Sequence, residues 1–209
     1  MSVDRLILLV FVLLVALYHS SVPLGEGPDE SGHFDYVLFL ARNGQLPLQQ
    51  AHPALSDVPG EGHQPPLAYL LMLPAVAWLP DDAAPLHLQS NPQFVWNDGT
   101  EPAATMRASR EYWPWSGTVL AWHLARGVST LLALLTLIAL AGAAQTFAQQ
   151  AGLPVRPIRL LAVTLVAFQP QFLFTAVLVT NDMLLTALSA LLLWLCLCSP
   201  GRPRPQQVQ

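Results

Sequence analysis

Three apolar runs without charged residues, or with a single charge, alternate with one long polar segment along this chain. The runs extend over Leu6–Gly25, between Arg126 and Arg156, and over Leu160–Gly201, where Asp182 is the one charge. A helix needs roughly 20 apolar residues to cross the hydrocarbon layer of a bilayer. The last run is about twice that length, so it is predicted to form two helices joined by a tight turn at 180–182.

The pattern therefore predicts an all-α integral membrane protein with about four transmembrane helices. The expected divisions are a first transmembrane helix over 1–25, a long external loop over 26–118, a second transmembrane helix over 119–149, a helical hairpin over 157–199 and a cytoplasmic tail over 200–209. The first run could instead be a cleaved signal peptide, because Ser20 and Ser21 are small. Asp4 cancels the positive charge that starts such a peptide, which favours a retained helix.

Two helical segments are predicted within the polar loop, and both should lie on the membrane surface. The first covers 28–43, where Phe34, Val37, Leu38 and Ala41 recur at helical spacing and Asn43-Gly44 ends the helix. The second covers 65–79 and is short for a crossing. The stretch from Pro80 to Pro114 is rich in Pro, Asn and Asp and is predicted to be loop.

Composition agrees with a membrane protein. The 209 residues are 53% hydrophobic and only 11% charged, and lysine is absent. All acidic residues except Asp4 and Asp182 lie between Glu26 and Glu111, so the negative charge belongs to the external loop. The arginines are scattered and form no basic stripe, which argues against nucleic acid as a partner.

The arginines also predict the orientation. With a cytoplasmic N-terminus, Arg5 and the pairs at 156/159 and 202/204 lie inside, beside membrane ends, as the positive-inside rule prefers. Loop 26–118 is then extracytoplasmic, in a multi-pass protein of the inner (plasma) membrane. An aromatic group marks the point where this loop returns to the membrane interface: Tyr112, Trp113, Trp115 and Trp122.

The polar residues of the loop form motifs with candidate chemistry. They are Pro28-Asp29-Glu30-x-x-His33-Phe34-x-Tyr36, Asn43-Gly44-x-Leu46-Pro47, His63-Gln64-Pro65-Pro66-Leu67-x-Tyr69, Gln169-Pro170-Gln171-Phe172 and Asn181-Asp182. In this order they resemble the N-terminal part of bacterial GT-C glycosyltransferases, in the protein O-mannosyltransferase and aminoarabinose transferase group. The resemblance covers nearly the whole chain.

The resemblance implies a polytopic membrane enzyme that takes a sugar from a polyprenyl-phosphate donor and passes it to an extracytoplasmic acceptor. Enzymes of this group generally have more crossings and a C-terminal part that completes the carrier groove. The chain is thus expected to correspond to the N-terminal half of such an enzyme, whether truncated, completed by a second polypeptide or left as a remnant without activity. The sugar, the acceptor and any metal are not specified by these motifs.

The resemblance also assigns roles to residues. Asp29 is the candidate base, with Glu30 supporting it and Asp182 as a second acidic catalytic residue. His33, His63, Gln64, Tyr69 and Asn181 are substrate-binding candidates. Asp29 and His33 are i and i+4 on a helix, so they share a face on which His33 could orient the carboxylate, contact phosphate or share a divalent metal ion.

Each motif also has a plainer interpretation. Pro-Asp-Glu is an ordinary helix start, the His63 motif can simply turn the chain onto the membrane surface, and Asn181-Asp182 can be a solvated turn. An alternative function is a non-catalytic membrane protein whose acidic loop binds a carrier lipid or a partner chain. A third interpretation is a metal-binding subunit that uses Asp29, His33, His63 and Asp182, although beyond Asp29 and His33 the spacing does not demand a metal.

Overall fold

The structure is a computed structural model that describes residues 3–80, 83, 86–94 and 103–199. The expected tail over 200–209 lies outside these residues. The described part is mostly helical, with seven α-helices: α1 (Val3–Ser21), α2 (Glu30–Asn43), α3 (Leu67–Val76), α4 (Gly117–Ala151), α5 (Val155–Ala167), α6 (Pro170–Thr175) and α7 (Asp182–Cys198). Two short 3-10 helices, Pro53–Leu55 and Ser109–Glu111, lie in the connections.

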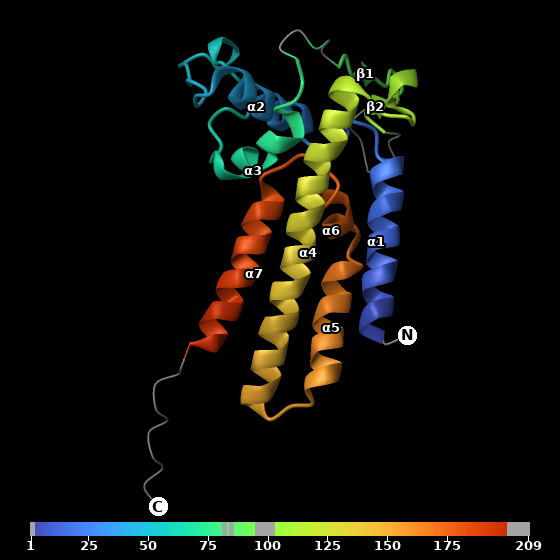
Figure 1. Ribbon diagram of the computed structural model, residues 1–209, viewed down its shortest axis with the longest axis vertical. Coiled ribbons are helices and arrows are strands. Elements are labelled where there is room, and N and C mark those ends of the chain that lie inside the picture. The colour runs from blue at the N-terminus through green and yellow to red at the C-terminus, as the bar shows by residue number, and fades with distance from the viewer. Residues whose placement is uncertain (1–2, 81–82, 84–85, 95–102, 200–209) are drawn as a thin grey trace, which may run out of the picture.

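The long helices run side by side, and the described parts of the polar loop gather at one end of them (Figure 1). The N-terminus and the connection between α4 and α5 lie at the opposite end. Two helices, α1 and α4, are long and apolar enough to cross a membrane. The other two helices predicted to cross the membrane are shorter: α5 has 13 residues and α7 has 17. That α5 and α7 cross a membrane remains a prediction.

Helix α4 is the central element, because both α5 and α7 pack along it. Close approach of α4 and α7 depends on Gly142, where a Cβ atom would overlap the indole of Trp194. The two arms of the predicted hairpin over 157–199 both pack on α4, more than on each other.

The connection between α5 and α7 is longer than a tight turn. Helix α5 ends at Ala167, and the Gln169 side chain accepts a hydrogen bond from the Phe172 N–H to cap α6. Pro170 occupies the first turn of α6, a position where its missing N–H costs nothing. The chain then returns through 176–181, so only the last residues of the connection coincide with the predicted turn at 180–182.

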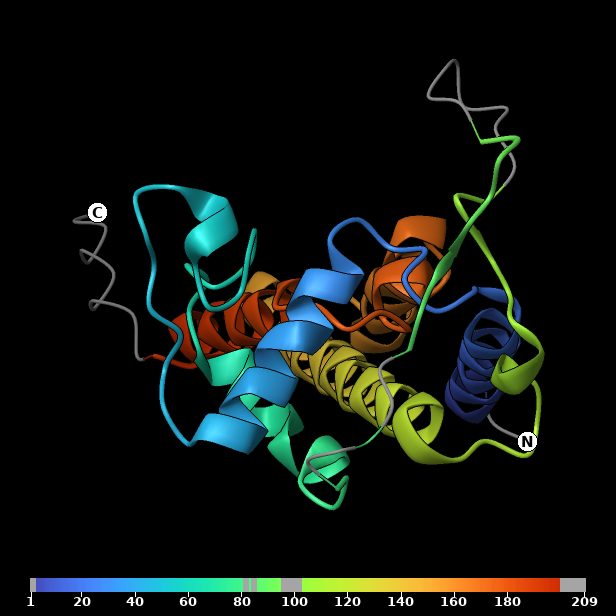
Figure 2. The same cartoon turned by 90° about the horizontal axis from the view of Figure 1, so that it is seen from above.

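Helices α2 and α3 lie across the end of the bundle, as the view along it shows (Figure 2). Helix α2 begins at Glu30, two residues after its predicted start, and ends at Asn43, where the following Gly44 caps the helix with a φ of 63°. Helix α3 ends at Val76, before its predicted end, and contains Pro74. Both helices pack on an apolar core that includes Phe34, Met72 and Trp122.

A small β-ladder interrupts the stretch predicted to be loop. Strand β1 (Gln89–Ser90) pairs antiparallel with β2 (Thr105–Met106), with Gln89 opposite Met106. Glu26 fastens this ladder, because its carboxylate accepts hydrogen bonds from the backbone N–H groups of Ala104 and Thr105 and from the Thr105 hydroxyl. Two-residue strands are too short to show an alternating pattern in the sequence.

Candidate functional site

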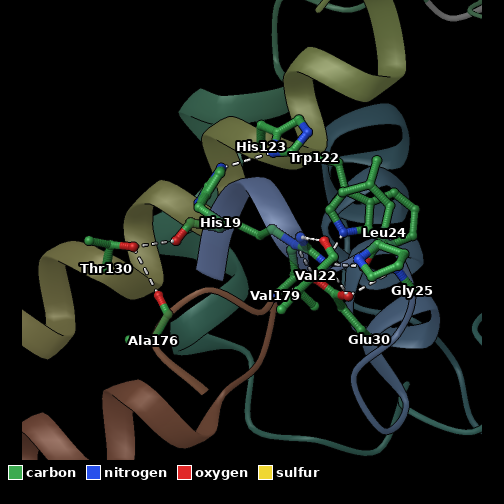
Figure 3. A network of polar contacts seen from close by, with 12 residues as sticks. His19, Val22, Leu24, Gly25, Glu30, Trp122, His123, Thr130, Ala176 and Val179 are labelled. Atoms are coloured by element: carbon green, nitrogen blue, oxygen red, sulfur yellow. Dashed lines mark hydrogen bonds and ion pairs between the residues drawn. The ribbon is translucent and has the colours of Figure 1, made fainter. Parts of the chain in front are cut away.

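Glu30 lies at the start of α2 and is completely buried. Its Oε1 accepts hydrogen bonds from Arg126 Nε at 2.7 Å, Trp122 Nε1 at 3.1 Å and Val179 N at 3.0 Å. Its Oε2 accepts hydrogen bonds from Arg126 Nη2 at 2.8 Å and Gly25 N at 3.0 Å. Figure 3 shows Trp122, Val179 and Gly25 around the carboxylate. Both oxygens of Glu30 are therefore occupied.

Arg126 is the cationic partner in this arrangement, and it is also completely buried. Its remaining donors bind the carbonyl oxygens of Val22, at 3.0 Å, and Pro23, at 2.7 Å. A buried ion pair is tolerated when its members satisfy each other and their remaining hydrogen-bonding groups. This Glu30–Arg126 pair joins α2 and the segment after α1 to α4, and through Val179 to the connection before α7.

Asp29, the neighbour of Glu30, has the opposite environment. It is exposed, and its carboxylate accepts no capping hydrogen bond from α2. Asp29 also has a φ of 56°, and among the described residues it is the only one other than glycine with a positive φ. Residues held in such sparsely populated conformations concentrate at functional sites. The fixed Glu30 and the strained backbone together hold the Asp29 carboxylate outside the core.

His33 follows Asp29 by one turn of α2 and meets a second segment of the chain. Its Nδ1 lies 2.8 Å from the hydroxyl of Tyr69 on α3 and 3.7 Å from Oε2 of Glu61. Tyr69 is completely buried and stacks on Tyr36, with ring centroids 4.1 Å apart. The imidazole is thus fixed by a buried phenol on one side and faces a carboxylate on the other.

Burial controls the charge of both rings. Desolvation lowers the pKa of His33, although the negative charges of Glu61, Asp182 and Asp29 oppose this effect. Desolvation and the charge of Glu61 raise the pKa of Tyr69. The lowered pKa of His33 favours the neutral imidazole beside the neutral phenol, and the 3.7 Å approach of Glu61 becomes an ion pair when His33 is protonated.

A third segment reaches the same place from the other half of the chain. The Asn181 amide donates a hydrogen bond to Gln64 Oε1 at 2.9 Å, which links the connection before α7 to the connection before α3. Asp182, the first residue of α7, is exposed, and its negative charge acts on both His33 and Tyr69. We call the whole group the acidic cluster: Asp29, His33, Glu61, Gln64, Tyr69, Asn181 and Asp182.

The acidic cluster unites most of the residues predicted to form a site. Two of the candidates lie apart from it. Glu30 is buried in the ion pair with Arg126, and His63 is exposed beside Gln64 without joining the contacts described above. Three helices, α2, α3 and α7, begin at the acidic cluster. Their N-terminal N–H groups give it positive partial charge.

Sequence reasoning missed Glu61 as a neighbour of His33, and it missed the contact with Gly32 that allows this approach. Glu61 is 9% exposed and packs over Gly32, where a Cβ atom would lie only 2.8 Å from Cγ of Glu61. A glutamate two residues before the His63-Gln64-Pro65-Pro66 motif was the available signal. Arg126 was also missed as a partner of Glu30. An arginine at the start of an uncharged apolar run is itself a sign of a buried acidic partner.

A metal ion at the acidic cluster would need ligands beyond those that the sequence indicated. The described residues contain no group of three or more His, Cys, Asp or Glu side chains arranged to hold one. In addition, Nδ1 of His33 is already engaged with Tyr69. Asp29 and His33 alone can supply at most part of a coordination shell.

Comparison of the chain with models of protein families, with curated proteins and with solved structures finds no match in any of the three.

Proposed function

We propose that this protein is a membrane glycosyltransferase, or the N-terminal half of one, that transfers a sugar from a polyprenyl-phosphate donor to an extracytoplasmic acceptor. In this proposal the chain crosses the inner membrane several times and exposes 26–118 outside. The observation that carries the proposal is the convergence of three distant segments, containing Asp29, Gln64 and Asn181-Asp182, at the end of two helices apolar enough to cross a membrane.

The acceptor side of the reaction needs a base. Asp29 is the best candidate because its carboxylate is exposed and accepts no capping hydrogen bond, and because its backbone has a left-handed φ of 56°. A positioned carboxylate that accepts a proton from the acceptor hydroxyl accelerates transfer by roughly 10²–10⁴-fold. Asp182, at the start of α7, is the second carboxylate, and its negative charge acts on the rings of His33 and Tyr69.

The donor side needs groups that bind a leaving phosphate. The acidic cluster offers neutral donors in Gln64 and Asn181 and the N-termini of three helices. Backbone N–H groups at helix N-termini are suited to phosphate. Arg126 is unsuited to this task, because its donors are committed to Glu30 and to two carbonyl oxygens.

The test uses the protein in liposomes with a polyprenyl phosphate that carries a radiolabelled hexose. We expect label to pass to an acceptor in added membranes, and Asp182→Asn to reduce the rate at least tenfold. Asp35→Asn is the matched control, since Asp35 is an exposed carboxylate on α2 outside the acidic cluster. Equal transfer by the two variants would remove Asp182 from the site.

The alternative is a non-catalytic membrane protein that binds a carrier lipid, and the exposed carboxylates of Asp29 and Asp182, together with the three helix N-termini, are compatible with it. The same liposomes separate the two functions. Binding of unmodified polyprenyl phosphate without transfer of hexose in the wild type would favour the binding protein. Transfer that depends on Asp182 would favour the enzyme.

A further inference from the structure

An apolar groove with a volume of about 660 Å³ runs between α1, α4 and α5. It lies in the half of the bundle that contains the N-terminus, far from the acidic cluster. Its walls are formed by aliphatic and aromatic side chains, including Ile7, Phe11, Leu137, Ile138 and Leu160. Helix α1 forms one wall of the groove with Ile7, Leu8, Phe11 and Val12, although only Phe11 and Val15 of that helix are buried.

One end of the groove is polar and basic. Arg159 Nη2 lies 2.7 Å from Asp4 Oδ1, and both side chains are partly exposed. Arg5 follows Asp4 on α1, and Arg156 precedes Arg159 by about one turn on α5; both are exposed. In the described part of the chain, Asp4 is the only acidic residue at this end. Among the described residues at this end of the helices, three arginines therefore accompany one carboxylate, and Arg159 is the arginine that lines the groove.

We propose that this groove binds an anionic phospholipid of the cytoplasmic leaflet, with an acyl chain along the apolar walls and the phosphate against Arg156 and Arg159. The inference goes beyond sugar transfer and rests on the proposed membrane topology. Basic pockets between helices on the cytoplasmic side attract anionic headgroups. The distribution of polarity also matches an amphiphile with one charged end, since the walls of the groove are apolar and one end carries charge.

The charge favours this lipid over other occupants. A neutral lipid would leave the excess positive charge of Arg5, Arg156 and Arg159 without a counterpart. A second copy of the chain inserted in the same direction would bring the same arginines to the same end and add like-charge repulsion. An anionic headgroup supplies the opposite charge, while its acyl chain covers the apolar walls.

The experiment is native mass spectrometry of the full chain, released from detergent after equilibration with equal amounts of phosphatidylglycerol and phosphatidylcholine of identical acyl chains. We expect the wild type to retain phosphatidylglycerol preferentially. Arg156→Gln and Arg159→Gln should each lower that preference about fivefold, which corresponds to about 1 kcal/mol for one basic residue. Arg42→Gln is the matched control, because Arg42 is exposed on α2 at the other end.

Asp4→Asn distinguishes a lipid site from a purely structural ion pair. If the pair only holds α1 against α5, then Asp4→Asn and Arg159→Gln should have the same effect. If the groove binds an anionic lipid, Asp4→Asn should increase retention of phosphatidylglycerol, since it removes the opposing negative charge, and Arg159→Gln should decrease it. Opposite signs support the lipid site, and equal signs overturn it.

The groove itself is tested by filling it. Ala141 lines the groove, so Ala141→Phe should reduce retention of both lipids, whereas Ala151→Phe, the same change at the exposed end of α4, should leave retention unchanged. Equal retention of the two lipids by the wild type would contradict the proposal. A lipid-free species containing two chains would also overturn it and assign the groove to a second copy.

Discussion

Glu30 and Asp29 are adjacent residues of one acidic motif, yet they belong to two regions with opposite character. Glu30 is completely buried, and five N–H donors bind its two oxygens. Asp29 is exposed, uncapped and held at a φ of 56°. A carboxylate with both oxygens occupied stabilises the fold, whereas one held free at the surface is available to react. The comparison teaches that only one of these two adjacent carboxylates is open to solvent.

The largest effect is expected when one member of the buried Glu30–Arg126 ion pair is removed. Glu30→Gln should lower the free energy of unfolding by about 3–5 kcal/mol, because it leaves the Arg126 charge buried without its partner. Thermal unfolding in detergent measures the loss. Arg42→Gln, a change to an exposed arginine on α2, is the control and should leave the midpoint within about 0.5 kcal/mol of the wild type.

Much of this arrangement could be predicted from local pattern. The apolar runs predicted α1 and α4, and the helical spacing of Phe34 and Val37 together with Asn43-Gly44 predicted α2. Such signals lie within a few residues of each other. The pairing of Glu30 with Arg126 joins positions 96 residues apart, and no local pattern encodes it. The approach of Glu61 to His33 was hidden for the same reason.

The packing of the helices was also beyond sequence reasoning. The runs predicted that 157–199 forms two helical arms, but not that both would pack on α4, which depends on small residues such as Gly142 meeting Trp194. The three motifs of the acidic cluster were predicted as candidates, and their convergence became visible only in three dimensions.

A second prediction concerns the contact between Gly32 and Glu61. Gly32→Ala should destabilise the protein by about 1–3 kcal/mol, because its Cβ would overlap Cγ of Glu61. Gly127→Ala tests whether glycine loss alone explains the effect, because Gly127 also lies within a helix and nothing lies within 4 Å of its Cβ. If Glu61→Ala fails to relieve the defect of Gly32→Ala in the double variant, the proposed contact is not its cause.

A smaller effect separates the charge of Asp29 from its backbone. Asp29→Asn should keep the stability of the wild type, because asparagine adopts the left-handed conformation readily, whereas Asp29→Ala should be less stable than Asp29→Asn by about 1 kcal/mol. Chemical unfolding of both variants measures the difference. Equal stability would show that the conformation at position 29 relaxes when the carboxylate is removed.

The smallest effect is a pH dependence that arises at His33. Because burial lowers the pKa of His33 in the folded protein, the unfolded chain binds more protons as the pH falls below the ordinary histidine value of about 6.5. The contribution of His33 to stability is therefore complete above that pH and decreases below it, down to the lowered pKa. Between pH 8 and pH 5, the free energy of unfolding should decrease less in His33→Gln than in the wild type. An identical loss would contradict this assignment.

The central claim is tested most directly by measuring hexose transfer and thermal unfolding together for Asp29→Asn and Glu30→Gln. The account predicts that Asp29→Asn unfolds like the wild type and transfers hexose at least 10²-fold more slowly, while Glu30→Gln is strongly destabilised. Transfer at the wild-type rate by Asp29→Asn would contradict the claim that the exposed member of the acidic pair performs the chemistry.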